Sequence, residues 1–252
     1  MFQTPRFLQN SFSITFARIS DIRRRANAVE DALHQVLPGH YTIPQVIPVP
    51  DELDPEVPRL LFGSTHGYSQ ILISQISLVL NVQYSPDWQA DIARGEAYLR
   101  ERVPPLFSVL AALHGATPLF AGLTTLARTP TRPDVTDAML LNLLAQRTLH
   151  TDAAPDMFDL QVKTTRIVDE HFYSNVTVKN FRGWPQEQMA SGVVPISTTA
   201  AVERGIELHG DFNDRYRFNE SPDYTTDADS AHTIITRGIA TVVQELQAVQ
   251  EG

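Results

Sequence analysis

Apolar and polar residues follow two successive periods along the first part of the chain. In residues 10–18, large apolar side chains alternate with Ser and Thr, a period of two that is typical of a strand with one buried face. Apolar residues then recur every three or four positions over residues 22–36, which predicts a helix that Ser20 can cap. The chain therefore begins with a strand followed by an amphipathic helix.

A proline-rich connection and a hairpin come next. Residues 41–58 contain five prolines, whose fixed dihedral angles and missing N–H groups predict an extended connection at the surface. Residues 59–65 and 68–84 then predict a hairpin across His66-Gly67. The apolar positions of its second arm change parity at Ser74-Gln75, so we expect a bulge or a further short turn there.

A long apolar stripe over residues 88–113 predicts the second helix. Pro104 and Pro105 interrupt its hydrogen-bond ladder, so we expect either a kinked helix or two helices in line that finish at Gly115. The large indoles of Trp88 and Trp184 are expected to act as anchors in the core or at a junction between lobes.

The second half of the chain repeats this order of elements. It predicts a strand, a helix, two antiparallel strands, an irregular segment, a last strand and a closing helix, at residues 118–128, 134–150, 158–167 with 172–181, 183–201, 204–218 and 227–249. The helix at 134–150 is apolar on most sides, which favours a position between other elements.

The repeated order predicts an α+β fold of two pseudo-repeated units, each with a strand, a helix, antiparallel strands and a long helix. The expected lobes are residues 1–115 and 116–252, packed as one compact unit with helices on one face of two curved antiparallel sheets. Seams of this kind often hold ligands. A single α+β domain without duplication is the alternative, because strand and helix patterns are common.

Composition narrows the classes of function. The chain has 252 residues, a formal charge of -9 and no cysteine. The missing cysteine excludes a disulfide scaffold, a thiol nucleophile, a thiolate zinc site and an iron–sulfur cluster. The acidic balance opposes a nucleic-acid partner, because such binding rests mainly on Lys and Arg. No signal peptide or spanning segment is recognised, which predicts a cytosolic protein with no membrane partner.

Chemistry-bearing motifs are not found in the sequence. No G-x-x-x-x-G-K-[ST], G-x-G-x-x-G, H-E-x-x-H or G-x-S-x-G motif occurs, so no catalytic residue, metal ligand or cofactor is assigned.

The densest polar cluster of a predicted strand lies in residues 204–218, and its members are His209, Asp211, Asp214, Arg215 and Arg217. His209, Asp211 and Arg215 share one parity, opposite to the apolar positions, and residues two apart on a strand lie about 6.5 to 7 Å from each other. They could share a ligand, a metal or a proton-transfer site. The other interpretation is the solvated side of an antiparallel sheet.

Four short segments carry a resemblance to a known family: Leu61-Phe62-Gly63-Ser64-Thr65-His66-Gly67, Tyr84-Ser85-Pro86-Asp87-Trp88, Phe120-Ala121-Gly122-Leu123 and Leu208-His209-Gly210-Asp211-Phe212-Asn213. In their order and spacing the chain is similar to a sporadically distributed family of uncharacterised prokaryotic proteins of about this length. The resemblance implies no activity, because none is assigned to that family.

Two hypotheses of function follow. The first is a cytosolic binding or interaction protein without catalysis, whose partner is a small molecule, a peptide, another protein or a second copy of the chain. The second is a hydrolase or lyase that uses His209 and Asp211 as an acid–base pair or as metal ligands.

Overall fold

The computed structural model describes residues 1–185 and 201–251. The described residues form one nine-stranded sheet in the order β2-β3-β4-β5-β1-β6-β9-β8-β7, and every neighbouring pair is antiparallel. The strands are β1 (Arg6–Phe16), β2 (Gln45–Val46), β3 (Leu60–Gly63), β4 (Ser69–Ile73), β5 (Ser77–Gln83), β6 (Pro118–Pro130), β7 (Gln161–Val168), β8 (Phe172–Gly183) and β9 (Glu203–Asn213). The α+β class and the antiparallel pairing predicted from the sequence are confirmed.

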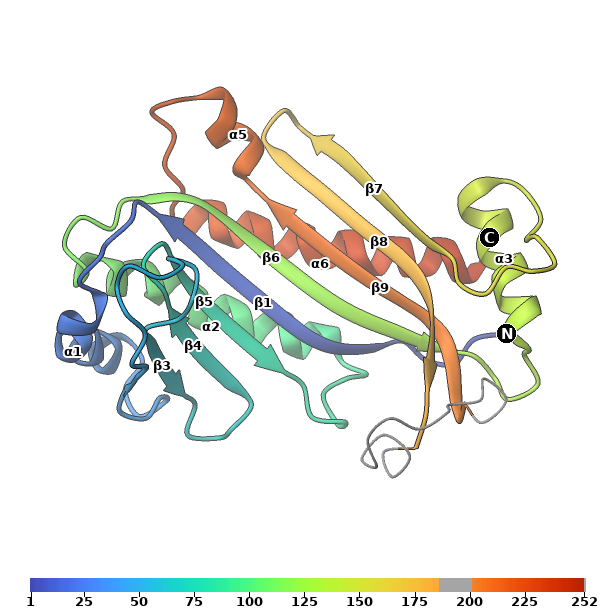
Figure 1. Ribbon diagram of the computed structural model, residues 1–252, viewed down its shortest axis with the longest axis horizontal. Coiled ribbons are helices and arrows are strands. Elements are labelled where there is room, and N and C mark those ends of the chain that lie inside the picture. Colours follow the sequence, from blue (N-terminus) through green and yellow to red (C-terminus); the bar gives the residue numbers. More distant parts are fainter. Residues whose placement is uncertain (186–200, 252) are drawn as a thin grey trace.

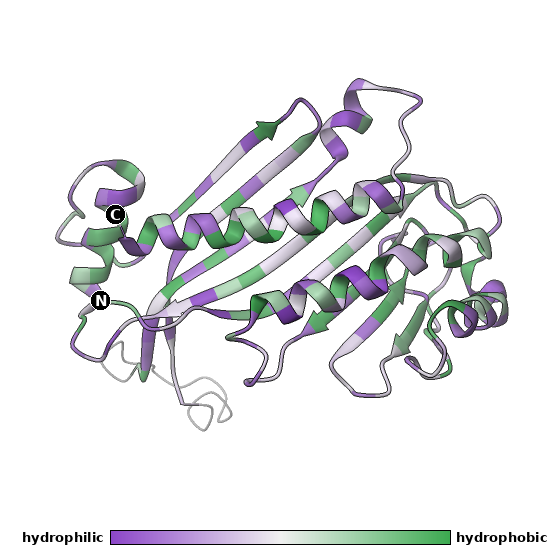
Figure 2. Ribbon diagram, turned by 180° about the vertical axis from the view of Figure 1, so that it is seen from behind, coloured by the Kyte–Doolittle hydropathy of each residue, from purple (hydrophilic) through white to green (hydrophobic). Residues whose placement is uncertain are grey.

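The two longest helices cross one face of the sheet (Figure 2), whereas the opposite face carries no helix along the middle strands (Figure 1). The helices are a 3₁₀ turn η1 (Ile22–Arg25), α1 (Ala26–Val36), α2 (Ile92–Ala111), α3 (Asp137–Leu149), α5 (Arg215–Glu220) and α6 (Ala228–Glu251). The guanidinium of Arg100 on α2 donates to the Thr236 hydroxyl on α6 at 2.6 Å, so the two long helices contact each other directly.

The core lies between this helical layer and the sheet. Phe12 and Ile14 of β1, Leu80 of β5 and Leu208 of β9 are fully buried, and their strand neighbours point to the other face. On the helical side, α2 contributes Leu99 and α6 contributes Ile235, both fully buried. The buried side of the central strands is therefore mainly apolar and the other side is polar, as period-two alternation favours.

The two sheets expected from the sequence are a single sheet. Residues 1–115 supply its β2-β3-β4-β5-β1 half and residues 116–252 supply its β6-β9-β8-β7 half. At the junction β1 pairs with β6 along most of its length, with Ser11 opposite Thr124. This ladder of hydrogen bonds closes the seam where the sequence predicted a ligand.

Several local predictions differ from the structure. The helix α2 begins at Ile92, runs through Pro104 and Pro105 as one helix and ends at Ala111. The helix α3 lies at one end of the sheet, near both termini (Figure 1), and its Met139 is 47% exposed, so it is not enclosed between other elements. Ser20 is not the cap of the first helix, which begins as a 3₁₀ turn after Asp21.

Two turns are confirmed. The first hairpin joins β3 to β4 across Gly67, whose φ of +78° favours glycine. The second arm breaks into β4 and β5 at Ser74, whose backbone N–H donates to the Ser77 carbonyl at 2.9 Å. The irregular segment expected at 183–201 lies mostly outside the described residues. No helix among the described residues is both long enough and apolar enough to cross a membrane.

Candidate functional site

The structure divides the predicted polar cluster between a strand and the segment after it. The strand β9 ends at Asn213, so only His209 and Asp211 lie on it. Both point to the face without helices, opposite to Leu208 and Phe212, which confirms their shared parity. The prediction that the strand continues to residue 218 is wrong, because the chain turns at Asp214 and forms the short helix α5.

Asp211 is held by amides of the same sheet. Its carboxylate accepts hydrogen bonds from Asn175 at 3.0 Å and from Asn213 at 2.9 Å. His209 is exposed, and its imidazole makes no hydrogen bond with the part of the chain that the structure describes. Within the same residues no group of three His, Asp or Glu side chains could hold a metal ion. The surroundings of Asp211 are those of a structural carboxylate on a solvated sheet face.

Asp214 has a structural environment of a different kind. It is 1% exposed, and its carboxylate accepts hydrogen bonds from the Ala121 backbone N–H and from the Tyr224 hydroxyl, both at 2.7 Å. Burial raises the pKa of Asp214, and these hydrogen bonds oppose the shift without cancelling it. Asp214 therefore ties the end of β9 to β6 and to the segment that leads into α6.

Arg215 and Arg217 lie on α5 and not on the strand. The Arg215 guanidinium stands 5.3 Å from the centre of the Phe120 ring, and that of Arg217 stands 5.3 Å from the centre of the Tyr224 ring. The structure therefore separates His209 and Asp211, on the open sheet face, from Asp214, Arg215 and Arg217, which lie at and after the end of β9.

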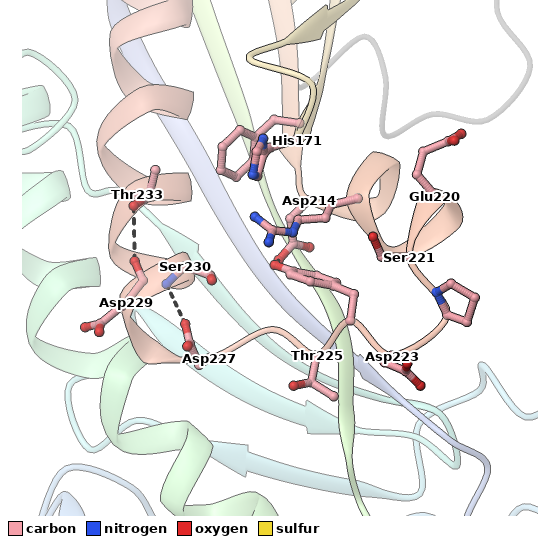
Figure 3. A pocket seen from close by; sticks show the side chains of 14 residues that line it. His171, Asp214, Glu220, Ser221, Asp223, Thr225, Asp227, Asp229, Ser230 and Thr233 are labelled. Atoms are coloured by element: carbon pink, nitrogen blue, oxygen red, sulfur yellow. Dashed lines mark hydrogen bonds between the residues drawn. The ribbon is translucent and has the colours of Figure 1, made fainter.

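A polar pocket of about 860 Å³ lies where this segment meets the start of α6 (Figure 3). Asp214, Arg217 and His171 line it together with Asp223, Asp227 and Asp229. The Asp227 carboxylate accepts the backbone N–H of Ser230 at 2.8 Å, which is helix capping. Carboxylates at a helix start satisfy free amides and the helix dipole, so this cluster has a structural explanation.

A second pocket, of about 320 Å³, has aromatic walls and lies at the start of α2. Tyr68, Tyr84, Trp88 and Tyr98 form its walls. The Tyr84 and Trp88 rings are stacked, with centroids 6.3 Å apart and planes 14° apart, and the Trp88 and Tyr98 rings meet edge to face at 5.9 Å. The pocket combines apolar walls with few polar groups, which is typical of small-molecule sites.

Hydrogen bonds from neighbouring residues hold the hydroxyl groups of two tyrosines of this pocket in place. The side-chain amide of Asn10, which is fully buried, donates to the Tyr84 hydroxyl at 2.7 Å, and the Tyr98 and Ser69 hydroxyls share a hydrogen bond of 2.6 Å. On α2, a Cβ at Gly95 would stand 2.8 Å from the Tyr84 hydroxyl oxygen, so only glycine leaves room for that ring. Burial raises the pKa of Tyr84 well above its usual range, which keeps the hydroxyl protonated.

Two arginines lie over the rings. Arg102 stands 3.8 Å from the centre of the Tyr98 ring, and Arg94 stands 3.9 Å from the centre of the Trp88 ring. The Arg102 side chain is 9% exposed, pairs with Glu101 at 3.1 Å and contacts the Nδ1 atom of His40 at 3.3 Å. A nearly buried guanidinium therefore lies at the wall of an aromatic pocket.

Sequence reasoning missed this pocket. The sequence pattern predicts an anchor at Trp88 and indicates no role for Tyr98 or Arg102. A usable signal was the spacing of Tyr98 and Arg102, four residues apart on one helix face, next to a segment that already held Tyr84 and Trp88. A search of protein-family models and a search of curated proteins found no match to the chain.

Proposed function

We propose that the protein is a cytosolic binding protein without bond-making chemistry, and that a small molecule binds in the aromatic pocket at the start of α2. The observation that carries the proposal is the pocket itself, a cavity of about 320 Å³ that Tyr84, Trp88 and Tyr98 line. That volume is at the lower end of the range for small-molecule sites. It suits a ligand of one or two fused rings.

The chemistry of the lining supports binding more than catalysis. The hydroxyls of Tyr84 and Tyr98 are engaged by Asn10 and Ser69, and the raised pKa of Tyr84 makes it a poor proton donor near neutral pH. The second hypothesis, acid–base or metal chemistry at His209 and Asp211, has less support, because two amides occupy the Asp211 carboxylate.

We also propose that residues 1–115 and 116–252 are duplicated units. The order of strands supports this: β3-β4-β5-β1 in one half faces β7-β8-β9-β6 in the other across the β1–β6 junction. In each half a long helix follows the third strand of the antiparallel group. The resemblance to the sporadically distributed prokaryotic family stays a prediction.

A matched pair of exposed aromatic residues tests the pocket. Tyr68 lines it and is 55% exposed, whereas Phe158 lies elsewhere and is 58% exposed. We expect naphthoate or naphthamide to bind the wild type in isothermal titration calorimetry, and Tyr68→Ala to weaken binding about fivefold through loss of one aromatic contact. Phe158→Ala should bind like the wild type. Absence of binding by every naphthalene derivative, or equal weakening in both variants, would contradict the proposal.

A further inference from the structure

We infer that the ligand of the aromatic pocket is an aromatic carboxylate whose carboxylate group pairs with Arg102. This inference rests on the proposed function, since it names the class of ligand for the same pocket. Three features carry it: the aromatic walls, the position of Arg102 over the Tyr98 ring, and the unequal exposure of Arg102 and its present partner.

The aromatic walls alone would also suit a cation, because the face of an aromatic ring attracts positive charge. In this pocket one of those faces is already covered by an arginine that lines it. The guanidinium of Arg102 lies over the Tyr98 ring, 3.8 Å from the ring centre. A cationic ligand would meet the positive charge of Arg102 where an empty aromatic cage offers none. The pocket therefore favours a neutral or anionic ring.

The pairing of Arg102 supports the anion. Its side chain is 9% exposed, but the side chain of Glu101, with which it pairs at 3.1 Å, is 61% exposed. Both residues line the pocket. An exposed carboxylate gains little from such a pair, because water solvates it almost as well. A ligand carboxylate inside the pocket would meet the same guanidinium with less solvent around it, so it can replace Glu101.

Geometry also limits the shape of the ligand. Trp88 and Tyr98 both line the pocket and meet edge to face at 5.9 Å, so two flat aromatic rings stand next to each other in its wall. Arginine binds a carboxylate through two parallel N–H groups, which orients a flat acid. A ring with a carboxylate in or near its plane satisfies the walls and Arg102 together.

The test uses three naphthalene derivatives that differ in charge: naphthoate, naphthamide and naphthylmethylammonium. Calorimetry on the wild type should show naphthoate binding about tenfold tighter than naphthamide, since a charge-assisted hydrogen bond is stronger than a neutral one. The ammonium compound should bind more weakly than the amide. Equal affinities for the acid and the amide, or preference for the ammonium compound, would overturn the inference and leave the pocket as a binding site.

Variants assign the preference to Arg102. In Arg102→Gln the acid and the amide should bind equally. Glu101→Gln, a change at an exposed side chain that leaves folding intact, should raise naphthoate affinity about threefold and leave naphthamide unchanged, because the competitor for Arg102 is removed. Arg94→Gln is the control and should keep the acid-to-amide ratio. A ratio that Glu101→Gln does not increase would overturn the inference. Failure of all three compounds to bind the wild type would remove the proposed function as well.

Discussion

The aromatic pocket and the polar pocket occupy corresponding places in the two halves of the molecule. Each lies beside a hairpin turn, β3–β4 or β7–β8, at the end of a strand, β5 or β9, and at the start of a long helix, α2 or α6. Each helix start is capped by an aspartate: the Asp91 carboxylate accepts the Arg94 backbone N–H at 3.1 Å and Asp227 accepts that of Ser230 at 2.8 Å. The two pockets are therefore surrounded by corresponding strands, turns and helices, but their lining residues differ in polarity.

The difference comes from the connection between strand and helix. In the first half only residues 84–91 separate β5 from α2, and they bring Trp88 against Tyr98 and Tyr84 against Gly95 of the helix. In the second half residues 214–227 include α5 and place Asp214 and several carboxylates around a wider space. The short aromatic connection of the first half lines a small apolar pocket. The long polar connection of the second half lines a larger, polar pocket. Substitutions at matched positions of the two halves test this difference.

The largest expected loss of stability comes from shortening one buried side chain on each of the two long helices. Leu99 of α2 and Ile235 of α6 are both fully buried. We expect Leu99→Ala and Ile235→Ala each to lower the free energy of unfolding by about 3 kcal/mol, through lost burial and the cavity left behind. Because β1 and β6 join the halves in one sheet, each variant should unfold in a single transition in urea.

The two tryptophans make that experiment specific to each half. Trp88 lies in the first half and Trp184 follows β8 in the second, so single-tryptophan variants report on each half by fluorescence. The midpoints should coincide in each core variant. Met139→Ala, at a site 47% exposed, is the control and should change stability by less than about 0.5 kcal/mol. Separate midpoints for the two tryptophans would show that the halves unfold independently.

A smaller effect is expected from the two tyrosines that fix the pockets. Tyr84→Phe leaves the buried Asn10 amide without its acceptor, and Tyr224→Phe removes a donor from the Asp214 carboxylate. Each should cost about 1 kcal/mol at neutral pH. Only the second cost should depend on pH, because only its partner titrates.

The direction of that dependence follows from Asp214. Its pKa is raised in the folded protein, so the folded state holds the proton more tightly than the unfolded state, and stability falls as pH rises through the raised pKa. The Tyr224 hydroxyl stabilises the charged form. The cost of Tyr224→Phe should therefore be full above that pKa and shrink as pH falls through it, whereas the cost of Tyr84→Phe should stay constant. Chemical denaturation at a series of pH values measures both, with Tyr68→Phe as an exposed control. Parallel pH profiles for the two variants would contradict this assignment.

The periodicity of apolar residues in the sequence predicts those strands and helices that bury one face. Alternation identified β1, β8 and the hairpin at Gly67, and the helical period identified α6, because burial on one face imposes these patterns. It failed at the end of β9, where Tyr216 and Phe218 continue the strand parity by chance although they lie on α5. At the end of the strand the Asp214 carboxylate accepts a hydrogen bond from the Ala121 backbone N–H, 93 positions away, and the local pattern of residues carries no sign of this contact.

The candidate site was less predictable for a related reason. The aromatic pocket is assembled from the hairpin turn at residues 64–68, the end of β5 and one face of α2, which are separate in sequence. The pair of His209 and Asp211 was visible because two neighbours on one strand need no tertiary structure to share a face. Single-strand pairs are thus easier to predict than pockets, whether or not they carry function.

The smallest expected effect tests that pair. His209 is exposed on the open face of the sheet, between Leu126 of β6 and Thr177 of β8. Because its imidazole contacts no described hydrogen-bond partner, we expect His209→Ala to change the free energy of unfolding by less than about 0.5 kcal/mol. Thermal shift with zinc, manganese and magnesium should be the same for the wild type and the variant. A metal site at His209 and Asp211 would instead stabilise the wild type on metal addition, and the variant would lose that stabilisation. Such a difference would favour the hypothesis of a metal-dependent enzyme at the open sheet face over the proposed binding function of the aromatic pocket, because a bound metal ion can activate water or a substrate.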